Sequence, residues 1–332
     1  MNGLQLALPG VLADSVEWVW SDDFEEAPDV KRYEHSTVMR EELVAALAPR
    51  AGGIYVDATL GGGGHTIALL EVEPKARVVA VDRDRSAITA AEARLATVAD
   101  RVSFVHAPFS RVFEELAERG ISQVDGLLAD LGVSSPQLDD ADRGMSFRRE
   151  GPIDMRMDPE SGETALELID RCSDDELADY IFQYGDERRS RRIARSIKKA
   201  LAGGELRTTL DLRRAIVRAV GPARIGGVDP ATRTFQALRI AVNGELTELE
   251  SLLEALPGGV RVGGRVAILS FHSLEDRLVK RSFAAGPWAP MTKKPVVPSD
   301  EECDRNPRAR SAKMRSAVRS PGDGVANAEG AD

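Results

Sequence analysis

The sequence predicts an α/β protein built on a doubly wound parallel sheet. Strand-like and helical segments alternate along its first part, with strands at 54–58, 77–82, 102–106 and 124–131 and helices at 65–72, 85–97 and 109–119. Such alternation is typical of parallel strands joined by helical crossovers. A run of four glycines follows the first strand, and carboxylates stand at the ends of the second and fourth. A doubly wound sheet binds ligands at the carboxyl ends of its strands, so a ligand site is expected there.

The segments on either side complete the secondary structure. A helix is expected over 39–47, before the first strand, and segment 132–160 is rich in Gly, Pro, Ser and Asp and should be a loop. Apolar residues at helical spacing predict helices between 165 and 220. A long amphipathic helix is expected over 235–256, interrupted at Asn243-Gly244.

The end of the chain returns to the sheet. It is expected to hold a strand at 265–270, a helix at 273–284, an irregular loop at 286–310 and a last strand at 313–319. The predicted organisation has four parts: a weakly ordered acidic extension (1–32), a core (33–140 and 230–320), a helical, substrate-binding insertion after the fourth strand (141–229) and a tail (321–332).

The glycine run from Gly61 to Gly64 indicates a cofactor cradle, because backbone approaches a ligand most closely where there is no Cβ. Asp82, about 20 residues further on, is placed to bind ribose hydroxyls. A dinucleotide fingerprint needs a third glycine where Thr66 stands, and Asp57 would repel a pyrophosphate but could pair with an ammonium group. S-adenosylmethionine therefore fits better than NAD. A tight turn without a ligand is the simpler alternative.

Composition limits the function classes. A chain of 332 residues with 42% hydrophobic and 30% charged residues is typical of a soluble globular protein. No apolar run approaches the roughly 20 residues of a membrane span, and the first 15 residues lack the basic region of a secretory signal. Two distant cysteines, Cys172 and Cys303, and four histidines predict neither a disulfide framework nor a metal site. We expect a cytoplasmic protein.

The net charge of −10 conceals a basic region. Residues 188–239 contain fourteen Lys and Arg against three acids, an excess of +11, and residues 293–319 contain eight more basic residues. A basic cluster on an acidic protein indicates a polyanionic substrate, although each cluster could also be a solvated helix face. The substrate contacts expected on the helix of Ile193 and Ile197 are Arg188, Arg189, Arg192 and Arg195.

From Tyr33 to about Arg319 the chain resembles the bacterial 16S ribosomal RNA (cytosine-N4) methyltransferase family of the MraW type. The resemblance does not cover the first 32 residues. It is carried by the motifs at 34–39, 57–65, 80–84, 130–139, 143–144, 151–158, 231–239 and 270–277.

The resemblance implies a class I (Rossmann-like) methyltransferase core, S-adenosylmethionine as donor, and the N4 amine of a cytidine at the decoding centre as acceptor. It implies cofactor contacts at Gly63, Gly64, His65, Asp82, Phe109, Asp130 and Gln137. Phe109 could stack on adenine, and Asp130 and Gln137 could bind the amino-acid end. As alternatives, Phe109 could be a core residue and His65 a helix cap.

The acceptor site is less well defined. The cytosine amine is a weak nucleophile, so the protein must accept its hydrogens and hold it in line with the methyl group. Many amino-methyltransferases have an Asp/Asn/Ser-Pro-Pro-aromatic turn after the fourth strand, whereas this chain has Ser134-Ser135-Pro136 without an aromatic residue. The candidates are the carbonyls of Ser134 or Ser135, Asp139 and His272. The target base is expected to leave its stack.

Other functions stay open at this point. The chain could act on another nucleic acid, could be a non-catalytic ribosome-assembly factor that retains the fold, or could be a nicotinamide oxidoreductase. The expected partner is 16S ribosomal RNA, expected in the assembled small subunit with naked RNA left open as an alternative, and no membrane. The oligomeric state is open, with a homodimer as one possibility.

Overall fold

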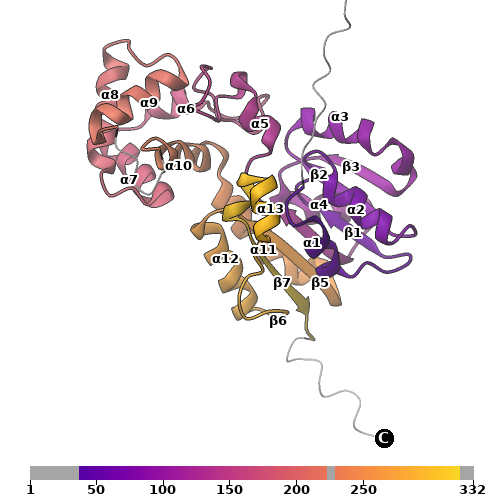
Figure 1. Cartoon of the computed structure of the whole chain (residues 1–332). Coiled ribbons are helices and arrows are strands. Elements are labelled where there is room, and N and C mark those ends of the chain that lie inside the picture. The colour runs from indigo at the N-terminus through magenta and orange to yellow at the C-terminus, as the bar shows by residue number, and fades with distance from the viewer. Residues whose placement is uncertain (1–36, 223–228, 322–332) are drawn as a thin grey trace, which may run out of the picture. The chain divides into compact units, whose positions relative to one another are not determined.

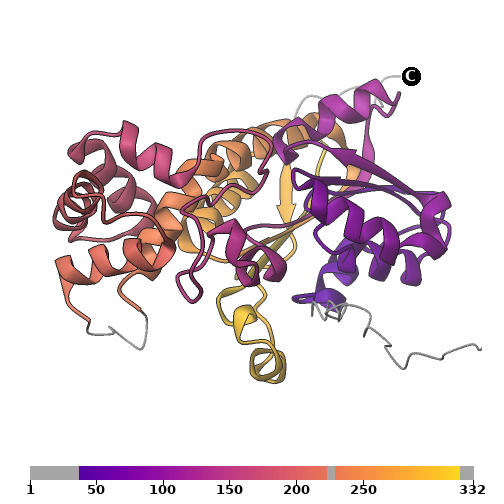
Figure 2. The ribbon, with the colours of Figure 1, turned by 90° about the horizontal axis from the view of Figure 1, so that it is seen from above.

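A single seven-stranded sheet organises the computed structural model, which describes residues 37–222 and 229–321 (Figures 1 and 2). The strands are β1 Ile54–Asp57, β2 Arg77–Asp82, β3 Val102–His106, β4 Val124–Asp130, β5 Val260–Ser270, β6 Trp288–Pro290 and β7 Lys313–Arg319. Their order is β3-β2-β1-β4-β5-β7-β6, with β1 to β5 parallel and β7 antiparallel to both of its neighbours. The predicted doubly wound sheet is confirmed, and its topological switch point lies between β1 and β4.

Helices cover both faces of the sheet. On one face, Val78 and Ala80 belong to the same apolar layer as α1 (Arg40–Leu47), α2 (Gly64–Val72) and α3 (Arg85–Arg94). On the other face, Val79 and Val81 share a layer with α4 (Val112–Glu118), α11 (Glu245–Gly259) and α12 (Ser273–Ala285). Burial on both faces explains why the central strands are continuously apolar. Ligands are thereby left to bind at the strand ends.

A group of helices follows β4 in the chain and precedes α11 and β5. They are α5 Ser135–Asp139, α6 Ala165–Arg171, α7 Asp174–Gly185, α8 Ser190–Ala202, α9 Thr209–Val220 and α10 Thr232–Asn243. Figure 1 shows α6 to α10 gathered in one group of helices. They share an apolar cluster of their own, which includes Ile181, Ile197 and Ile216. Capping boxes at Thr164 and Ser173 start α6 and α7, because each side chain satisfies a backbone N–H of the first turn.

Several elements differ from the expectations. The long amphipathic helix is two helices, α10 and α11, because Gly244 takes a left-handed conformation with φ 60° and ends α10. Segment 286–310, expected to be irregular, holds β6, α13 (Asp300–Arg305) and a 3-10 turn (Pro307–Ser311). Strand β6 forms by pairing with β7, a distant segment, which local sequence does not indicate.

Smaller differences concern boundaries. Strand β5 begins at Val260 instead of 265, and α5 lies within the expected loop 132–160. The helix expected over 85–97 ends at Arg94, and a 3-10 turn follows it. The expected extension 1–32 lies outside the described residues, as does the tail beyond Pro321. No helix in the described ranges is long and apolar enough to cross a bilayer.

Candidate active site

The glycine run forms a sharp turn between β1 and α2. Gly61 and Gly63 have φ values of 49° and 74°, in the left-handed region that favours glycine. A Cβ added to Gly64 would lie 1.8 Å from Oγ1 of Thr37, so this close approach also requires glycine. The N–H of Gly61 donates to Oδ2 of Asp82 at 2.8 Å. The turn is thereby fixed to the end of β2.

Thr66, which stands where a dinucleotide fingerprint has its third glycine, has a structural partner. Its hydroxyl donates to Oδ2 of Asp57 at 2.7 Å, and the N–H of Thr59 donates to Oδ1 of Asp57 at 3.2 Å. Asp57 is fully buried, and burial raises its pKa to about 7. These contacts favour a role for Asp57 in bracing α2 against β1, rather than the expected pairing with an ammonium group.

Asp82 lies at the end of β2, where the ribose-binding carboxylate is expected. Its Oδ2 accepts from Gly61, and its Oδ1 accepts from the N–H of Asp84 at 2.8 Å. Burial raises the pKa of Asp82 to about 6. Each carboxylate oxygen has a further lone pair, so Asp82 can still accept hydrogen bonds from two hydroxyls.

Gln137 connects α5 to the end of β2. Its side-chain amide donates to Oδ2 of Asp84 at 2.9 Å, and its Oε1 accepts from the N–H of Ser134 at 3.1 Å. Arg143 lies 2.9 Å from the same Asp84 oxygen. Burial opposes the ionisation of Asp84, but hydrogen bonds from Ser86, Gln137 and Arg143 lower its pKa. Asp84 was not predicted as a site residue; the signal for it is its place as the cap of α3.

Asp130 and His65 lie close together at the ends of β4 and the glycine turn. Nδ1 of His65 is 3.9 Å from Oδ2 of Asp130, and its Nε2 is 3.0 Å from the carbonyl oxygen of Val38. His65 is therefore not a helix cap, a position that Gly63 occupies. Oδ1 of Asp130 is buried and has no hydrogen-bond partner in the part of the chain that is described. Burial, and then the charges of Asp57 and Glu275, raise the pKa of Asp130 to about 8.

Phe109 begins a 3-10 turn, Phe109–Arg111, directly after β3. Its ring is partly buried against the apolar layer that contains α4 and α11. It therefore contributes to the core, as the simpler alternative holds, but the partial exposure leaves ring surface for the expected stacking on adenine.

His272 belongs to a buried polar cluster between the end of β5 and the junction of α10 and α11. Its Nδ1 accepts the N–H of Glu275 at 3.4 Å and so caps α12. Oε2 of Glu275 accepts from the N–H groups of Phe271 and His272, at 2.8 and 3.3 Å. Arg239 donates two hydrogen bonds to Glu245, at 2.7 and 2.8 Å. Glu275 and Arg239 were not predicted as site residues, although they belong to the motifs at 270–277 and 231–239.

The same cluster has the spacing of a metal site. The ligand atoms of Glu245, His272 and Glu275 lie within 4.8 Å of one another. Two contacts argue against a metal ion. Arg239 already neutralises Glu245, and His272 accepts through Nδ1, which leaves the proton on Nε2, where a metal would bind. Burial opposes the ionisation of Glu275, but the contacts with His272 and Phe271 lower its pKa.

Asp139, another acceptor candidate, is exposed and paired. Its carboxylate accepts from both terminal nitrogens of Arg308, at 2.7 and 3.2 Å, and this pairing lowers the pKa of Asp139. Ser135 is the first residue of α5, which Ser134 caps. Of the candidate side chains, His272 is the one that is nearly buried at a strand end. The structure thus favours His272 over Asp139.

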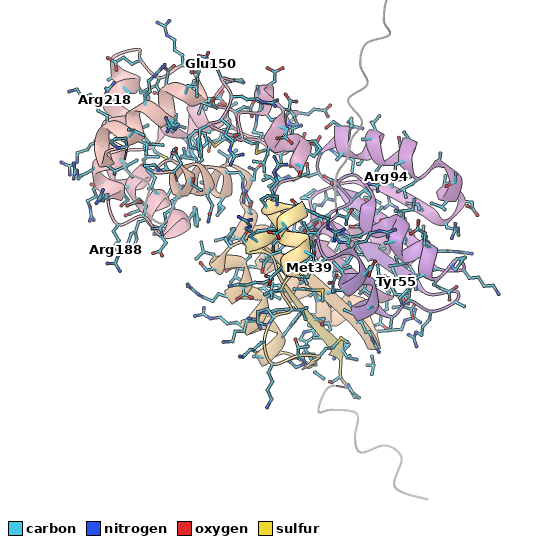
Figure 3. All side chains as sticks on the ribbon, in the orientation of Figure 1. Met39, Tyr55, Arg94, Glu150, Arg188 and Arg218 are labelled. Atoms are coloured by element: carbon cyan, nitrogen blue, oxygen red, sulfur yellow. The ribbon has the colours of Figure 1, made fainter. Side chains whose placement is uncertain are left out.

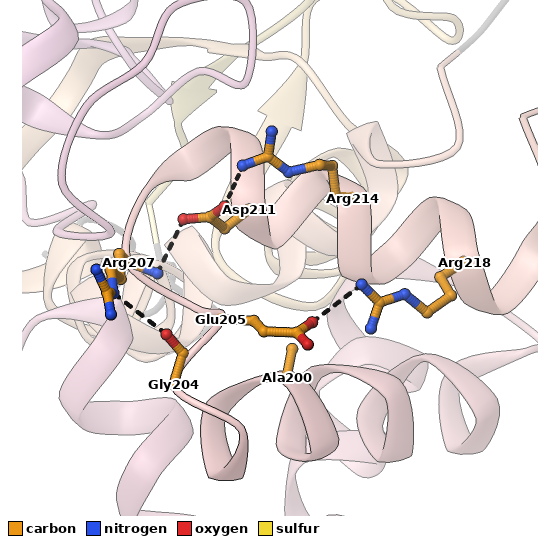
Figure 4. A pocket seen from close by; sticks show the side chains of 7 residues that line it. All are labelled: Ala200, Gly204, Glu205, Arg207, Asp211, Arg214 and Arg218. Atoms are coloured by element: carbon orange, nitrogen blue, oxygen red, sulfur yellow. Dashed lines mark hydrogen bonds and ion pairs between the residues drawn. The ribbon is translucent and has the colours of Figure 1, made fainter.

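The basic residues of α8 and α9 differ in their partners. On α9, three arginines are paired: Arg213 with Asp229, Arg214 with Asp211 and Arg218 with Glu205. The last two pairs line a pocket of about 370 Å³ together with Ala200, Gly204 and Arg207 (Figure 4). Two of its three guanidinium groups are neutralised by its own acids, and none of its lining residues belongs to the strand ends.

The basic residues at and near the start of α8 are freer. Arg188, Arg191, Arg192 and Arg195 are exposed and make no ion pair with an acid in residues 37–222 and 229–321. Arg189 is also exposed, but it donates to the carbonyl of Val220 at 3.0 Å. Figure 3 shows Arg188 and Arg218 at separate places on this group of helices. The four arginines of the first set can pair with an external anion without losing an internal ion pair; Arg195 also donates from Nε to the carbonyl of Arg191 at 3.1 Å.

Comparisons with known proteins show which family the chain is similar to. The model of the MraW methylase family matches residues 32–320. A relative from Sorangium cellulosum (strain So ce56), named ribosomal RNA small subunit methyltransferase H, is 64% identical over 293 residues, which cover 88% of this chain and 93% of the relative. Relatives of the same name from Synechococcus elongatus and Koribacter versatilis are 48% and 44% identical, and cover 86% and 87% of this chain and 95% of each relative. Among solved structures, an rRNA methylase from Streptococcus thermophilus covers 85% of this chain and 94% of its own, with a TM-score of 0.41 and 10% identity.

Proposed function

The chain belongs to the MraW methylase family, with S-adenosylmethionine as its cofactor, and from that premise we propose that it methylates small-subunit ribosomal RNA. In this proposal the acceptor is the exocyclic N4 amine of a cytidine in 16S RNA, at the decoding centre of the assembled subunit. The shared name of the relatives supports the RNA. The motif resemblance supports the nucleoside and its position.

The observation that carries the proposal is the set of carboxylates at the ends of β1, β2 and β4, of which Asp57 is buried and Asp82 and Asp130 are partly buried. Burial raises the pKa values of Asp57, Asp82 and Asp130 to about 7, 6 and 8. A cationic ligand favours the ionised carboxylates and an anionic one opposes them. S-adenosylmethionine carries a sulfonium and an ammonium group, whereas a nicotinamide dinucleotide carries a pyrophosphate. The site therefore suits the methyl donor.

The proposed cofactor contacts follow from these positions. Asp82 accepts the ribose hydroxyls, Phe109 stacks on adenine, and Gly63 and Gly64 let the backbone approach the methionine portion. His65, Asp130 and Gln137 complete the set, with Gln137 acting largely through Asp84 and α5. The bound cofactor supplies a methyl group activated by the positive sulfur.

We assign RNA binding to the helical insertion, residues 141–229. The unpaired arginines near the start of α8 support this assignment, because phosphate contacts supply most sequence-independent affinity for nucleic acid. The proposed contacts are Arg188, Arg189, Arg192 and Arg195, to which the structure adds the exposed Arg191.

Transfer of labelled methyl groups tests the proposal. Small ribosomal subunits, total RNA and DNA would be incubated in parallel with labelled S-adenosylmethionine, and the products digested to nucleosides. We expect label in N4-methylcytidine from the subunits. Label in 5-methylcytidine or in DNA would show that the enzyme has another substrate. A protein that binds the cofactor and transfers nothing would instead be a ribosome-assembly factor that has kept the fold.

A further inference from the structure

Two buried polar atoms without a partner stand at neighbouring strand ends. Oδ1 of Asp130, at the end of β4, and Nε2 of His272, just after β5, are both inaccessible to solvent and have no hydrogen-bond partner among the residues described. Strands β4 and β5 are paired, with Asp130 opposite Leu269. A buried polar atom without a partner is costly, so each atom indicates a ligand group that would complete it.

The two atoms have opposite hydrogen-bonding character. Nδ1 of His272 accepts the N–H of Glu275, so in the neutral ring the proton is on Nε2, which is a donor. The carboxylate oxygen of Asp130 is an acceptor. A ligand that completes both must present a donor to Asp130 and an acceptor to His272.

Glu275 holds the His272 ring in place. It contacts both nitrogens of the ring, through its own N–H to Nδ1 and through Oε1, which lies 3.1 Å from Nε2 outside hydrogen-bond geometry. It also binds the backbone on either side of the ring through the N–H groups of Phe271 and His272. Its charge lies close enough to Asp130 to contribute to the raised pKa of that residue.

We propose that Asp130 and His272 recognise the amine-bearing edge of the target base, with Glu275 as a positioning residue. Oδ1 of Asp130 accepts a hydrogen of the exocyclic amine, and the N–H of His272 donates to the adjacent ring nitrogen. This inference rests on the proposed function, and it gives Asp130 a role beyond cofactor binding.

The arrangement explains how the enzyme distinguishes cytosine from uracil. Cytosine presents an amine donor beside an acceptor, ring nitrogen 3. Uracil presents a carbonyl acceptor beside an N–H donor. Its carbonyl would face the acceptor oxygen of Asp130, and its N–H would face the N–H donor of His272. A site built to bond one pattern rejects the reverse pattern strongly, because its own buried groups are left unpaired.

The test measures recognition without catalysis. Dissociation constants would be measured for two kinds of small subunit, one with the target cytidine and one with uridine in its place, with saturating S-adenosylhomocysteine. We expect the wild-type protein to prefer cytidine by about tenfold or more, as for a good pair of base contacts. In Asp130→Asn and in His272→Phe the ratio should approach one. His272→Gln, which keeps a donor, should retain part of the preference.

Two further variants make the test specific. Glu275→Gln should lower the preference for cytidine, measured with S-adenosylhomocysteine at saturation so that any change in cofactor-site affinity does not enter the ratio. Glu248→Gln is the matched control, because Glu248 also has a buried carboxylate oxygen without a partner among the described residues, but it stands in the first turn of α11 and is not one of the side chains proposed to contact or position the base. Its preference should equal that of the wild type.

The outcomes separate this inference from the proposed function. Label outside N4-methylcytidine would overturn both. If the wild type forms N4-methylcytidine but has no preference for cytidine, or if Asp130→Asn and His272→Phe keep the preference, only the recognition by these two residues is wrong. Should one of them fail to fold, the other variant and Glu275→Gln decide the question.

Discussion

At the scale of single residues, three strand-end carboxylates have raised pKa values, and a nearby cation would favour their ionised forms. Asp57, Asp82 and Asp130 are held where burial makes ionisation unfavourable. Asp84, by contrast, is only 2% exposed, but it has hydrogen bonds from Ser86, Gln137 and Arg143 that favour its charge. The protein thus neutralises Asp84 with its own groups and holds Asp57 through Thr66 and Thr59, which leaves Asp82 and Asp130 as the carboxylates proposed to face a ligand.

Asp82→Ala should weaken S-adenosylmethionine binding by about ten- to hundredfold, because hydrogen bonds to a charged acceptor contribute about 1.5–3 kcal/mol. Isothermal titration calorimetry measures the change, and far-ultraviolet circular dichroism checks the fold, since Asp82 also holds Gly61. An unchanged affinity in a folded variant would contradict the ribose assignment.

Cofactor affinity should fall as the pH is lowered from about 8 to 6. The pKa values of the ligand-free protein, about 7, 6 and 8, mean that Asp57, Asp82 and Asp130 take up protons in this range. Because a bound cation favours the ionised forms, binding should release protons. Titrations in two buffers of different ionisation enthalpy detect this release.

The ligand-free protein should change stability in the opposite sense. Carboxylates whose folded-state pKa is raised above the unfolded value stabilise the fold at low pH, and this contribution is lost as the pH rises through the folded-state pKa. The contribution of these three groups should therefore decline between pH 4 and 8. Thermal unfolding with and without S-adenosylmethionine checks this, and stabilisation by the cofactor should be larger at pH 8 than at pH 6.

At the scale of elements, α8 and α9 make contrasting predictions. Replacing Arg188, Arg191, Arg192 and Arg195 with Gln should lower affinity for the RNA substrate and reduce its salt dependence by up to about one unit of slope per lost phosphate contact. The matched control replaces Arg214 and Arg218, which pair with Asp211 and Glu205. Filter binding at several salt concentrations gives the slopes, and cofactor affinity should be unchanged in both variants. Equal slopes for both sets would argue against α8 as the RNA-binding element.

The junction of α10 and α11 should be important for stability. Asn243 is buried, accepts from the N–H of Met157 at 2.7 Å and donates to the carbonyls of Met155 and Arg239 at 2.8 Å. Asn243→Ala should lower the free energy of unfolding by about 1–3 kcal/mol, because it leaves a buried backbone N–H without a partner. Denaturant titration measures this, with the exposed Ser251→Ala as a control that should change little.

Much of the sheet could be predicted from the sequence, because long apolar strands and glycine turns are local signals. The limits of β3 and β7 agree with the predicted ones. What sequence alone could not give are contacts between distant segments: the pairing of β6 with β7, the bond from Gln137 to Asp84, and the ion pair of Asp139 with Arg308. The proposed roles of the site residues remain predictions for the same reason, since they concern a ligand.

At the scale of the whole molecule, the apolar cluster of α6 to α10 is separate from the two layers on the sheet. Cofactor binding should therefore protect backbone amides at the strand ends, such as 57–66 and 82–86, and leave α8 and α9 unaffected. Hydrogen–deuterium exchange with and without S-adenosylmethionine tests this. If α8 and α9 were protected as much as the strand ends, the sheet and the α6–α10 cluster would open as one unit.

The position of β7 has a consequence for how the protein is made. It lies between β5 and β6 in the sheet, yet residues 271–312 separate it from β5 in the chain. A ribosome adding about 5–20 residues per second needs roughly 2–8 s for that stretch. During this time the edge of β5 that β7 will cover presents unpaired N–H and C=O groups, which can pair with other chains. A nascent molecule is thus most in need of chaperones in the seconds before residues 313–319 emerge.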